Sequence, residues 1–200
     1  LLDGGMGTML QAAGLKLGAR PEELNITDPA LIEGIHGQYA AAGSRIVNAN
    51  TFGASAHKLT GSAYTLEQVI TAGIENCKRA CAPYGALTAL DVGPLGELLE
   101  PSGTLAFEDA VAEYARIVKA GEAAGADLIF FETYTDLYEL KAALLAAKEN
   151  THLPILASMS FEAGGRTFTG CTVESFAATA RGLGADAVGI NCSLGPKEIF

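Results

Sequence analysis

The stretch Asp127-Leu128-Ile129-Phe130-Phe131-Glu132 decides the fold class of this 200-residue chain. Four large apolar residues follow one another with no polar residue between them, so both faces of the segment are expected to be buried. A strand buried on both faces is typical of a parallel sheet covered by helices. The stretch therefore predicts a central strand of a parallel sheet, and this strand ends in a carboxylate, Glu132.

Five other short runs of apolar or β-branched residues have the same character. They span residues 1–3, 45–50, 86–92, 154–160 and 187–191, and segments with helical signals separate them. A strict alternation of strands and helices predicts an α/β protein whose parallel strands are joined by right-handed crossovers.

Helices are predicted where an N-cap residue precedes an apolar stripe with helical spacing. Asp28 precedes a proline, which suits the first position of a helix. Thr65 has Gln68 three residues later, which is the spacing of a capping box. Asp136 has Glu139 at the same spacing, so the same arrangement is expected there. Two more helices are predicted, over residues 107–124 and around residues 173–180.

Two architectures fit this alternation, an open doubly wound sheet and a (β/α)8 TIM barrel. Polar residues or glycines follow almost every predicted strand. A barrel brings such strand ends together at one mouth, whereas an open sheet gathers its ligand residues at one switch point. The ring of polar strand ends favours the barrel. A full barrel has about 250 residues, so residues 1–200, with about six βα units, are expected to form one barrel domain cut off before it closes.

Composition and charge exclude two classes of partner. The net charge is −10 and no Lys/Arg cluster is present, whereas a nucleic-acid binder needs a basic face to neutralise phosphates. The apolar runs are far shorter than the roughly 18 residues that a membrane helix needs. We therefore expect neither a nucleic-acid nor a membrane partner.

The four cysteines predict reduced thiols in a cytoplasmic protein, since they form no CxxC pair and no secretory leader opens the sequence. Cys77 and Cys81 continue the apolar stripe of one helix, so core packing is favoured over a metal pair. Cys171 lies in a glycine-rich loop and is given no role. Cys192 follows the last predicted strand, where a buried thiol, a nucleophile and a metal ligand all remain open.

Two strand ends carry carboxylates with candidate functions. Asp3 is followed by Gly4 and Gly5, whose backbone lets a ligand approach closely, although a tight strand-to-helix turn explains the glycines equally well. Glu132 is either buried with a partner or faces the barrel mouth. Asp3 and Glu132 could together receive an ammonium group. The alternative is general acid–base catalysis, as in a barrel aldolase or hydrolase.

Five motifs occur in an order and spacing that cover essentially the whole chain. They are Asp3-Gly4-Gly5-Met6-Gly7-Thr8, Asn48-Ala49-Asn50-Thr51-Phe52, Asp91-Val92-Gly93-Pro94, Glu132-Thr133 and Gly189-Ile190-Asn191-Cys192-Ser193. Together they resemble the homocysteine S-methyltransferase family, with Ala49 standing where threonine is common. Residues 191–196 are most similar to the homocysteine module of cobalamin-dependent methionine synthases. They are also similar to bacterial homocysteine methyltransferases fused to a folate reductase.

The resemblance implies a (β/α)8 barrel that holds Zn2+ through three cysteines. One of these follows the sixth strand and matches Cys192. The other two are an adjacent pair after the last strand of the barrel. This sequence contains no adjacent cysteines, so these two ligands are expected beyond residue 200.

The resemblance also implies which residues bind the substrate. Asp3 and Glu132 match the positions where the family holds the amino group of homocysteine. Gly4 and Gly5 lie where backbone amides meet its carboxylate, and Asn191 is expected to belong to the same substrate-binding group.

The implied activity is zinc-dependent methyl transfer to the homocysteine thiol, which gives methionine. In methionine synthases the methyl group is carried by cobalamin and recharged from methyltetrahydrofolate, so folate- and cobalamin-binding domains of the same polypeptide are the expected partners. Two alternatives remain, a stand-alone enzyme that uses S-methylmethionine or betaine, and a fragment that only binds homocysteine. With one of the three zinc thiolates, the isolated chain is expected to be inactive.

Overall fold

The computed structural model describes residues 1–16, 18–193 and 195, in which a parallel β-sheet is flanked by helices. Its strands are β1 (Ile46–Asn48), β2 (Leu87–Val92), β3 (Leu128–Tyr134), β4 (Ile155–Met159) and β5 (Ala187–Ile190). The order in the sheet is the order in the sequence, and each strand is parallel to its neighbours. A doubly wound sheet reverses this order at its switch point, so the unreversed order confirms the prediction of a barrel wall.

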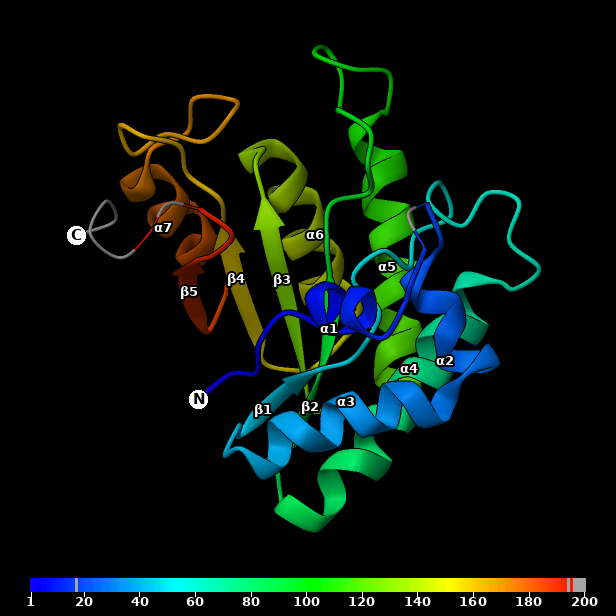
Figure 1. Cartoon of the computed structure of the whole chain (residues 1–200). Helices are drawn as coiled ribbons and strands as arrows, with labels where there is room; N and C mark the ends of the chain where they lie inside the picture. The colour runs from blue at the N-terminus through cyan, green and yellow to red at the C-terminus, as the bar shows by residue number, and fades with distance from the viewer. Residues whose placement is uncertain (17, 194, 196–200) are drawn as a thin grey trace.

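The helices form the outer layer of the fold. They are α1 (Met6–Ala12), α2 (Leu24–Thr27), α3 (Pro29–Ala41), α4 (Leu66–Cys81), α5 (Phe107–Ala123), α6 (Leu137–Asn150) and α7 (Val173–Gly182), with the 3-10 turns η1 (Pro21–Glu23) and η2 (Ala82–Tyr84). From α3 to α7 each helix contacts the next one along the chain, and α6 lies behind β3 in Figure 1. Within the described residues, we find no helix whose length and apolar character would let it cross a membrane.

Strand β3 is buried on both faces, as its apolar run predicted. Ile129 and Phe131 face the helices and belong to the main core. Leu128 and Phe130 face the other way, where they pack with Ala89 of β2 in a smaller core on the inner face of the sheet. Because side chains alternate along a strand, the inner face continues towards the carboxyl ends with polar residues. These are Asn48, Asp91, Glu132 and Ser158, which stand two residues after Ile46, Ala89, Phe130 and Leu156.

All three predicted N-cap residues are confirmed, and one of the two predicted capping boxes forms. The Asp28 carboxylate accepts a hydrogen bond from the Leu31 N–H at 3.2 Å, with a proline at the start of α3. At α4 the capping box is complete, since Thr65 Oγ1 accepts from Gln68 N at 3.3 Å and Gln68 Oε1 accepts from Thr65 N at 2.9 Å. Local sequence therefore determines where both helices begin.

The capping box predicted at the start of α6 does not form. Asp136 caps α6 by accepting from the Tyr138 N–H at 3.0 Å, but Glu139 does not reach back to it. Glu139 is buried instead, and its Oε1 accepts from Leu95 N at 2.7 Å and from the Tyr114 hydroxyl at 2.9 Å. It thereby ties α6 to α5 and to the loop after β2.

The first predicted strand is also wrong, because residues 1–3 form only an isolated parallel bridge between Leu2 and Ile46. The Leu1 carbonyl accepts from Arg45 N at 2.8 Å and from Ile46 N at 3.3 Å. The segment is too short to continue as a strand, because Gly5 already caps α1. It nevertheless lies beside β1, so that Asp3 stands where a first barrel strand would place it.

Candidate functional site

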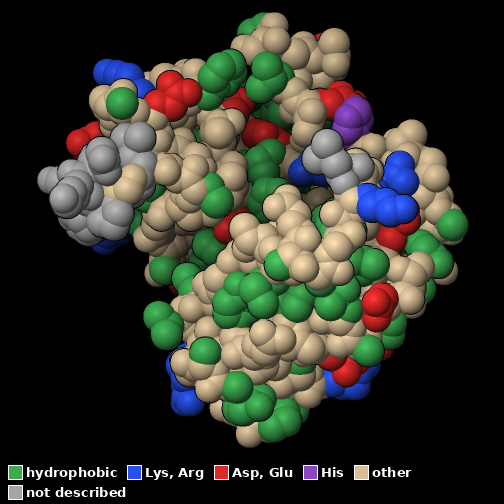
Figure 2. Space-filling view, in the orientation of Figure 1, with side chains coloured by type: hydrophobic (Ala, Val, Ile, Leu, Met, Phe, Trp, Pro, Cys, Tyr) green, Lys and Arg blue, Asp and Glu red, His purple; other side chains and the backbone are tan. Residues whose placement is uncertain are grey.

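A cavity of about 750 Å3 lies at the carboxyl ends of the strands, on the inner face of the sheet. Figure 2 shows a hollow with hydrophobic and acidic side chains in its walls. The structure brings together in this cavity all the residues that the sequence predicted for the site. They are Asp3, Gly4, Gly5, Glu132, Asn191 and Cys192.

The walls of the cavity are acidic. Asp3, Glu22, Asp91 and Glu132 contribute carboxyl groups, while no Lys or Arg of the described residues lines it. Burial raises the pKa of each of these four groups, because a charged carboxylate loses its hydration. Such a site favours a ligand that brings a positive charge.

Asp3 reaches the cavity from the segment beside β1. Its Oδ2 accepts a hydrogen bond from the Asn48 N–H at 3.0 Å, which fixes the direction of the side chain. Burial raises the pKa of Asp3 to about 7, although the Asn48 hydrogen bond lowers it, and the charge of Glu132 adds to the increase. Asp3 is therefore partly protonated near neutral pH, and a cation beside it would favour its charged form.

Gly4 and Gly5 hold the backbone against α3. A Cβ atom on Gly4 would lie 3.0 Å from the ring of Tyr39, so any larger residue would have to push this ring aside. The Tyr39 hydroxyl donates to the Gly5 carbonyl at 3.2 Å. The glycines therefore serve both of the alternatives raised by the sequence, since they form the turn into α1 and also line the cavity.

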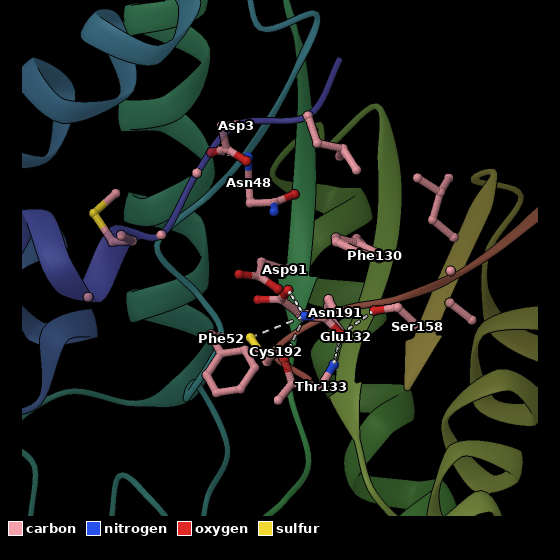
Figure 3. Close-up of a pocket in the computed structure, with 18 of the residues that line it drawn as sticks. Asp3, Asn48, Phe52, Asp91, Phe130, Glu132, Thr133, Ser158, Asn191 and Cys192 are labelled. Atoms are coloured by element: carbon pink, nitrogen blue, oxygen red, sulfur yellow. Dashed lines mark hydrogen bonds between the residues drawn. The ribbon is translucent and has the colours of Figure 1, made fainter. Parts of the chain in front are cut away.

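Asn191 joins the ends of three strands through one side-chain amide (Figure 3). Its Nδ2 donates to Glu132 Oε2 at 2.7 Å and to Thr133 Oγ1 at 2.8 Å. Its Oδ1 accepts from the Thr133 N–H at 3.1 Å and from the Ser158 hydroxyl at 2.8 Å. Because every polar atom of the amide is used, Glu132 is held in one orientation at the cavity.

Cys192 exposes its thiol at the edge of the cavity, directly after β5. Its φ is 48°, and Thr133 in the same network has a φ of 64°, both in the left-handed region that non-glycine residues rarely adopt. Such residues cost of order 1–3 kcal/mol and cluster at functional sites. The exposed thiol excludes the interpretation of Cys192 as a buried hydrophobic residue and leaves a nucleophile or a metal ligand.

The other cysteines lie away from this thiol. Cys77 and Cys81 are buried in α4 with their Sγ atoms 3.8 Å apart, which confirms core packing, and Cys171 does not line the cavity. Within residues 1–16 and 18–193, no three His, Cys, Asp or Glu side chains form a group that could hold a metal ion. A catalytic zinc site needs three protein ligands. The described residues therefore do not complete a zinc site by themselves.

Three further residues line the cavity without a role having been predicted for them. Asn48 and Asp91 were recognised as polar strand ends and as members of two of the five motifs, and Ser158 as a polar strand end alone. The sequence indicates their position through the alternation of side chains along a strand, since each stands two residues after an apolar residue of the inner face. Phe52 also lines the cavity and lies beside Cys192 in Figure 3, with the ammonium of Lys58 5.1 Å from its ring centroid.

Comparison with known proteins places this geometry in a family. A family model described as homocysteine S-methyltransferase matches residues 1–199. Methionine synthase of Mycobacterium tuberculosis (strain ATCC 25618 / H37Rv) is 31% identical over 98% of this chain, and that of Mycobacterium leprae (strain TN) is 32% identical over 98%. The chain spans only 18% of the length of each of these two relatives.

A solved structure shows the same fold. The metallated form of the homocysteine methyltransferase MmuM from Escherichia coli superposes with a TM-score of 0.86 and is 23% identical, and the match covers 99% of this chain and 76% of that one. The sheet of sequentially ordered parallel strands therefore has the arrangement of the homocysteine methyltransferase barrel. Since the family model covers nearly the whole chain, the protein belongs to the homocysteine S-methyltransferase family.

Proposed function

We propose that this chain is the homocysteine-binding module of a methionine synthase and takes part in zinc-dependent methyl transfer to the thiol of homocysteine. The observation that carries the proposal is the single cavity lined by the carboxyl groups of Asp3 and Glu132 and by the exposed thiol of Cys192. These groups match the two chemical ends of homocysteine, an ammonium group and a thiol.

The amino-acid end of homocysteine would bind between the two carboxyl groups and the glycine loop. Asp3 and Glu132 would receive the ammonium group through charge-assisted hydrogen bonds. The carboxylate of the substrate needs donors, and no Lys or Arg of the described part of the chain lines the cavity. Backbone N–H groups of Gly4 and Gly5 are therefore the donors that we propose for it.

The sulfur end of homocysteine would point towards Cys192. A free thiol has a pKa near 8.5, so little of it is thiolate at neutral pH. When Zn2+ is bound, it supplies the charge that keeps a coordinated thiol deprotonated. Cys192 is placed to be one zinc ligand, and two more thiolates would have to come from outside the described residues. Asn191 would keep the strand end that carries Cys192 in place.

The methyl donor that we propose is cobalamin held by another domain of the same polypeptide and recharged from methyltetrahydrofolate. The support is that the chain spans 18% of two methionine synthases, which leaves room in such proteins for further domains. A stand-alone enzyme that uses S-methylmethionine or betaine is the alternative. All four cysteines are free, which suits the reducing cytoplasm that we propose as the location.

The test is methionine formation from homocysteine by the full-length protein, with methylcobalamin, S-methylmethionine or betaine as the donor. We expect turnover with methylcobalamin, loss of turnover in Cys192→Ala and unchanged turnover in Cys171→Ala. Turnover with S-methylmethionine or betaine alone would favour the stand-alone alternative. If none of the donors yields methionine, and a metal-free preparation converts a keto acid or a sugar, the aldolase or hydrolase alternative with Asp3 and Glu132 would replace the proposal.

A further inference from the structure

Asp91 is a buried carboxyl group to which the proposed binding of homocysteine assigns no role. It lies on β2 with 7% of its surface exposed, and it lines the cavity. Thr51 holds its backbone in place, since Thr51 Oγ1 donates to the Asp91 carbonyl at 2.8 Å and accepts from the Asp91 N–H at 3.1 Å. The position of Asp91 is therefore as firmly determined as that of Glu132.

The side chains of Asp91 and Glu132 meet on the inner face of the sheet. Asp91 is in register with Phe130, so Glu132, two residues further along β3, projects from the same face next to it. The two carboxyl groups are in hydrogen-bond contact, and Figure 3 shows them side by side. No described N–H or O–H group of another residue donates to Asp91 Oδ1.

Two carboxyl groups in such contact need a proton between them, because ionised carboxylates can only accept hydrogen bonds. Two charged carboxylates side by side in a buried site would also repel each other strongly. Glu132 already receives a donor from the Asn191 amide at 2.7 Å, which favours its charged form. Asp91 has no such donor among the described residues and is more deeply buried, so the proton belongs to Asp91 and the charge to Glu132.

We propose that Asp91 is a positioning residue that donates a hydrogen bond from its protonated carboxyl group to Glu132 and so keeps Glu132 charged and aimed at the ammonium group of the substrate. The assignment rests on the proposed binding of homocysteine. Asn191 from β5 and Asp91 from β2 would then hold Glu132 from two sides. Burial raises the pKa of Glu132, and the hydrogen bond from Asp91 opposes this increase.

Other ionisable groups lie around Asp91 and Glu132, and their titration must be separated from that of Glu132. Those facing Asp91 or lining the same cavity are Asp3, Glu22, Lys58, Tyr134 and Cys192. Each of them is the same in wild type and in an Asp91 variant, and so are the amino and thiol groups of homocysteine. The ratio of the homocysteine affinity of the wild type to that of the variant, measured at one pH, therefore reports the effect of Asp91.

Removing the donor should make homocysteine binding depend on pH in a new way. In Asp91→Ala, Glu132 keeps the donor from Asn191 but loses the one from Asp91, so its pKa rises and more of it is protonated at neutral pH. We expect roughly a tenfold loss of affinity at pH 7, which corresponds to one pKa unit, and a recovery towards wild type as the pH rises to 9. Asp91→Asn keeps a donor to Glu132 and should follow wild type across the range.

The experiment is calorimetric titration of homocysteine into the full-length protein between pH 6 and 9. Asp127→Asn is the control, because Asp127 accepts from the Thr88 N–H at the opposite end of β3. If Asp91→Ala does not fold, Asp91→Val gives the same test with a residue that suits a strand.

Equal losses in the Ala and Asn variants, or a loss that does not change with pH, would overturn the assignment of Asp91 while leaving the proposed function intact. Wild-type protein that binds no homocysteine at any pH would overturn the proposed function and this assignment with it. A loss of homocysteine affinity in Asp91→Ala that is confined to the lower pH range, with the affinity of Asp91→Asn unchanged, supports both the proposed function and the assignment of Asp91.

Discussion

At the scale of single residues, the order of the site depends on Asn191, whose side-chain amide uses all its polar atoms in hydrogen bonds. The Asn191 amide bonds Glu132, Thr133 and Ser158, and no other residue type of its size offers two donors and an acceptor in this geometry. An aspartate at this position would lose both donors and add a negative charge beside Glu132. The order of the site therefore follows from one amide at the end of β5.

Asp3 should make the stability of the protein depend on pH. Its pKa is about 7 in the folded protein against an ordinary value of 3.8, so folding favours the protonated form. The folded state then binds more protons than the unfolded state, and stability falls as the pH rises from about 4 to 7. Asp3→Asn removes this loss, so the variant should gain stability over wild type at pH 8 but not at pH 4.

This prediction is checked by urea unfolding of both proteins at pH 4, 6 and 8. A stability difference of the same size at all three pH values would show that Asp3 does not titrate as we describe. The same substitution should weaken homocysteine binding, because it removes a charge from the proposed ammonium site.

Glu132 and Cys192 could be predicted from the sequence because each is a chemically distinctive residue directly after an apolar run. Asp91 occupies a similar position, but its contact with Glu132 depends on the register between β2 and β3, which pairs Asp91 with Phe130. The hydrophobic pattern determines which face of the sheet each side chain takes, but the residues around Asp91 do not show which residue of β3 lies opposite it. Single residues of the site were therefore predictable, and their pairing was not.

At the scale of elements, Glu139 shows that a residue three positions after an N-cap can either close a capping box or make a tertiary contact instead. Gln68 and Glu139 both stand three residues after an N-cap residue, and only Gln68 closes a capping box. Glu139 lies on the face of α6 that meets α5, where its Oε1 accepts hydrogen bonds from the Tyr114 hydroxyl and the Leu95 N–H. Tertiary contacts decide the direction of such a side chain, so the sequence predicted where the helix begins but not the role of its third residue.

Glu139→Ala should destabilise the fold more than Gln68→Ala does. The first variant leaves the buried Leu95 N–H without its acceptor, at a cost of roughly 1–3 kcal/mol, and also removes the hydrogen bond from the Tyr114 hydroxyl. The second removes one exposed hydrogen bond of a helix cap, with a cost of about 1 kcal/mol or less. Urea unfolding of the two variants measures the difference, and equal losses would contradict the structural role of Glu139.

At the scale of the whole molecule, the strands follow one another around the sheet as the alternating pattern predicted. Leu2 and Val188 lie at the two ends of the strand order and are 40% and 47% exposed. In a closed barrel, both ends would be covered by neighbouring strands. The sequence could predict the order of strands because polar residues or glycines follow almost every strand, which favours a barrel over the reversed order of a doubly wound sheet. It could not predict that the first segment forms a bridge instead of a strand.

The 200-residue chain should not hold zinc tightly. Cys192 is the one cysteine at the cavity, and within the described ranges no set of three ligands is present. We expect less than one zinc per chain after dialysis against a weak chelator, measured by metal analysis. Retention of one zinc per chain, lost in Cys192→Ala, would show that other residues of this chain complete the site.

The central claim is that the acidic cavity binds the ammonium group of homocysteine, and the affinity of Glu132→Gln tests it most directly. Glutamine still accepts the hydrogen bond from Asn191 but carries no charge. Losing a charge-assisted hydrogen bond costs roughly 1.5–3 kcal/mol, which corresponds to about a 10- to 150-fold weaker binding. Calorimetry on the full-length protein should show this loss in Glu132→Gln and none in Glu162→Gln, whose side chain is exposed on a loop. Unchanged homocysteine affinity in Glu132→Gln would contradict the account.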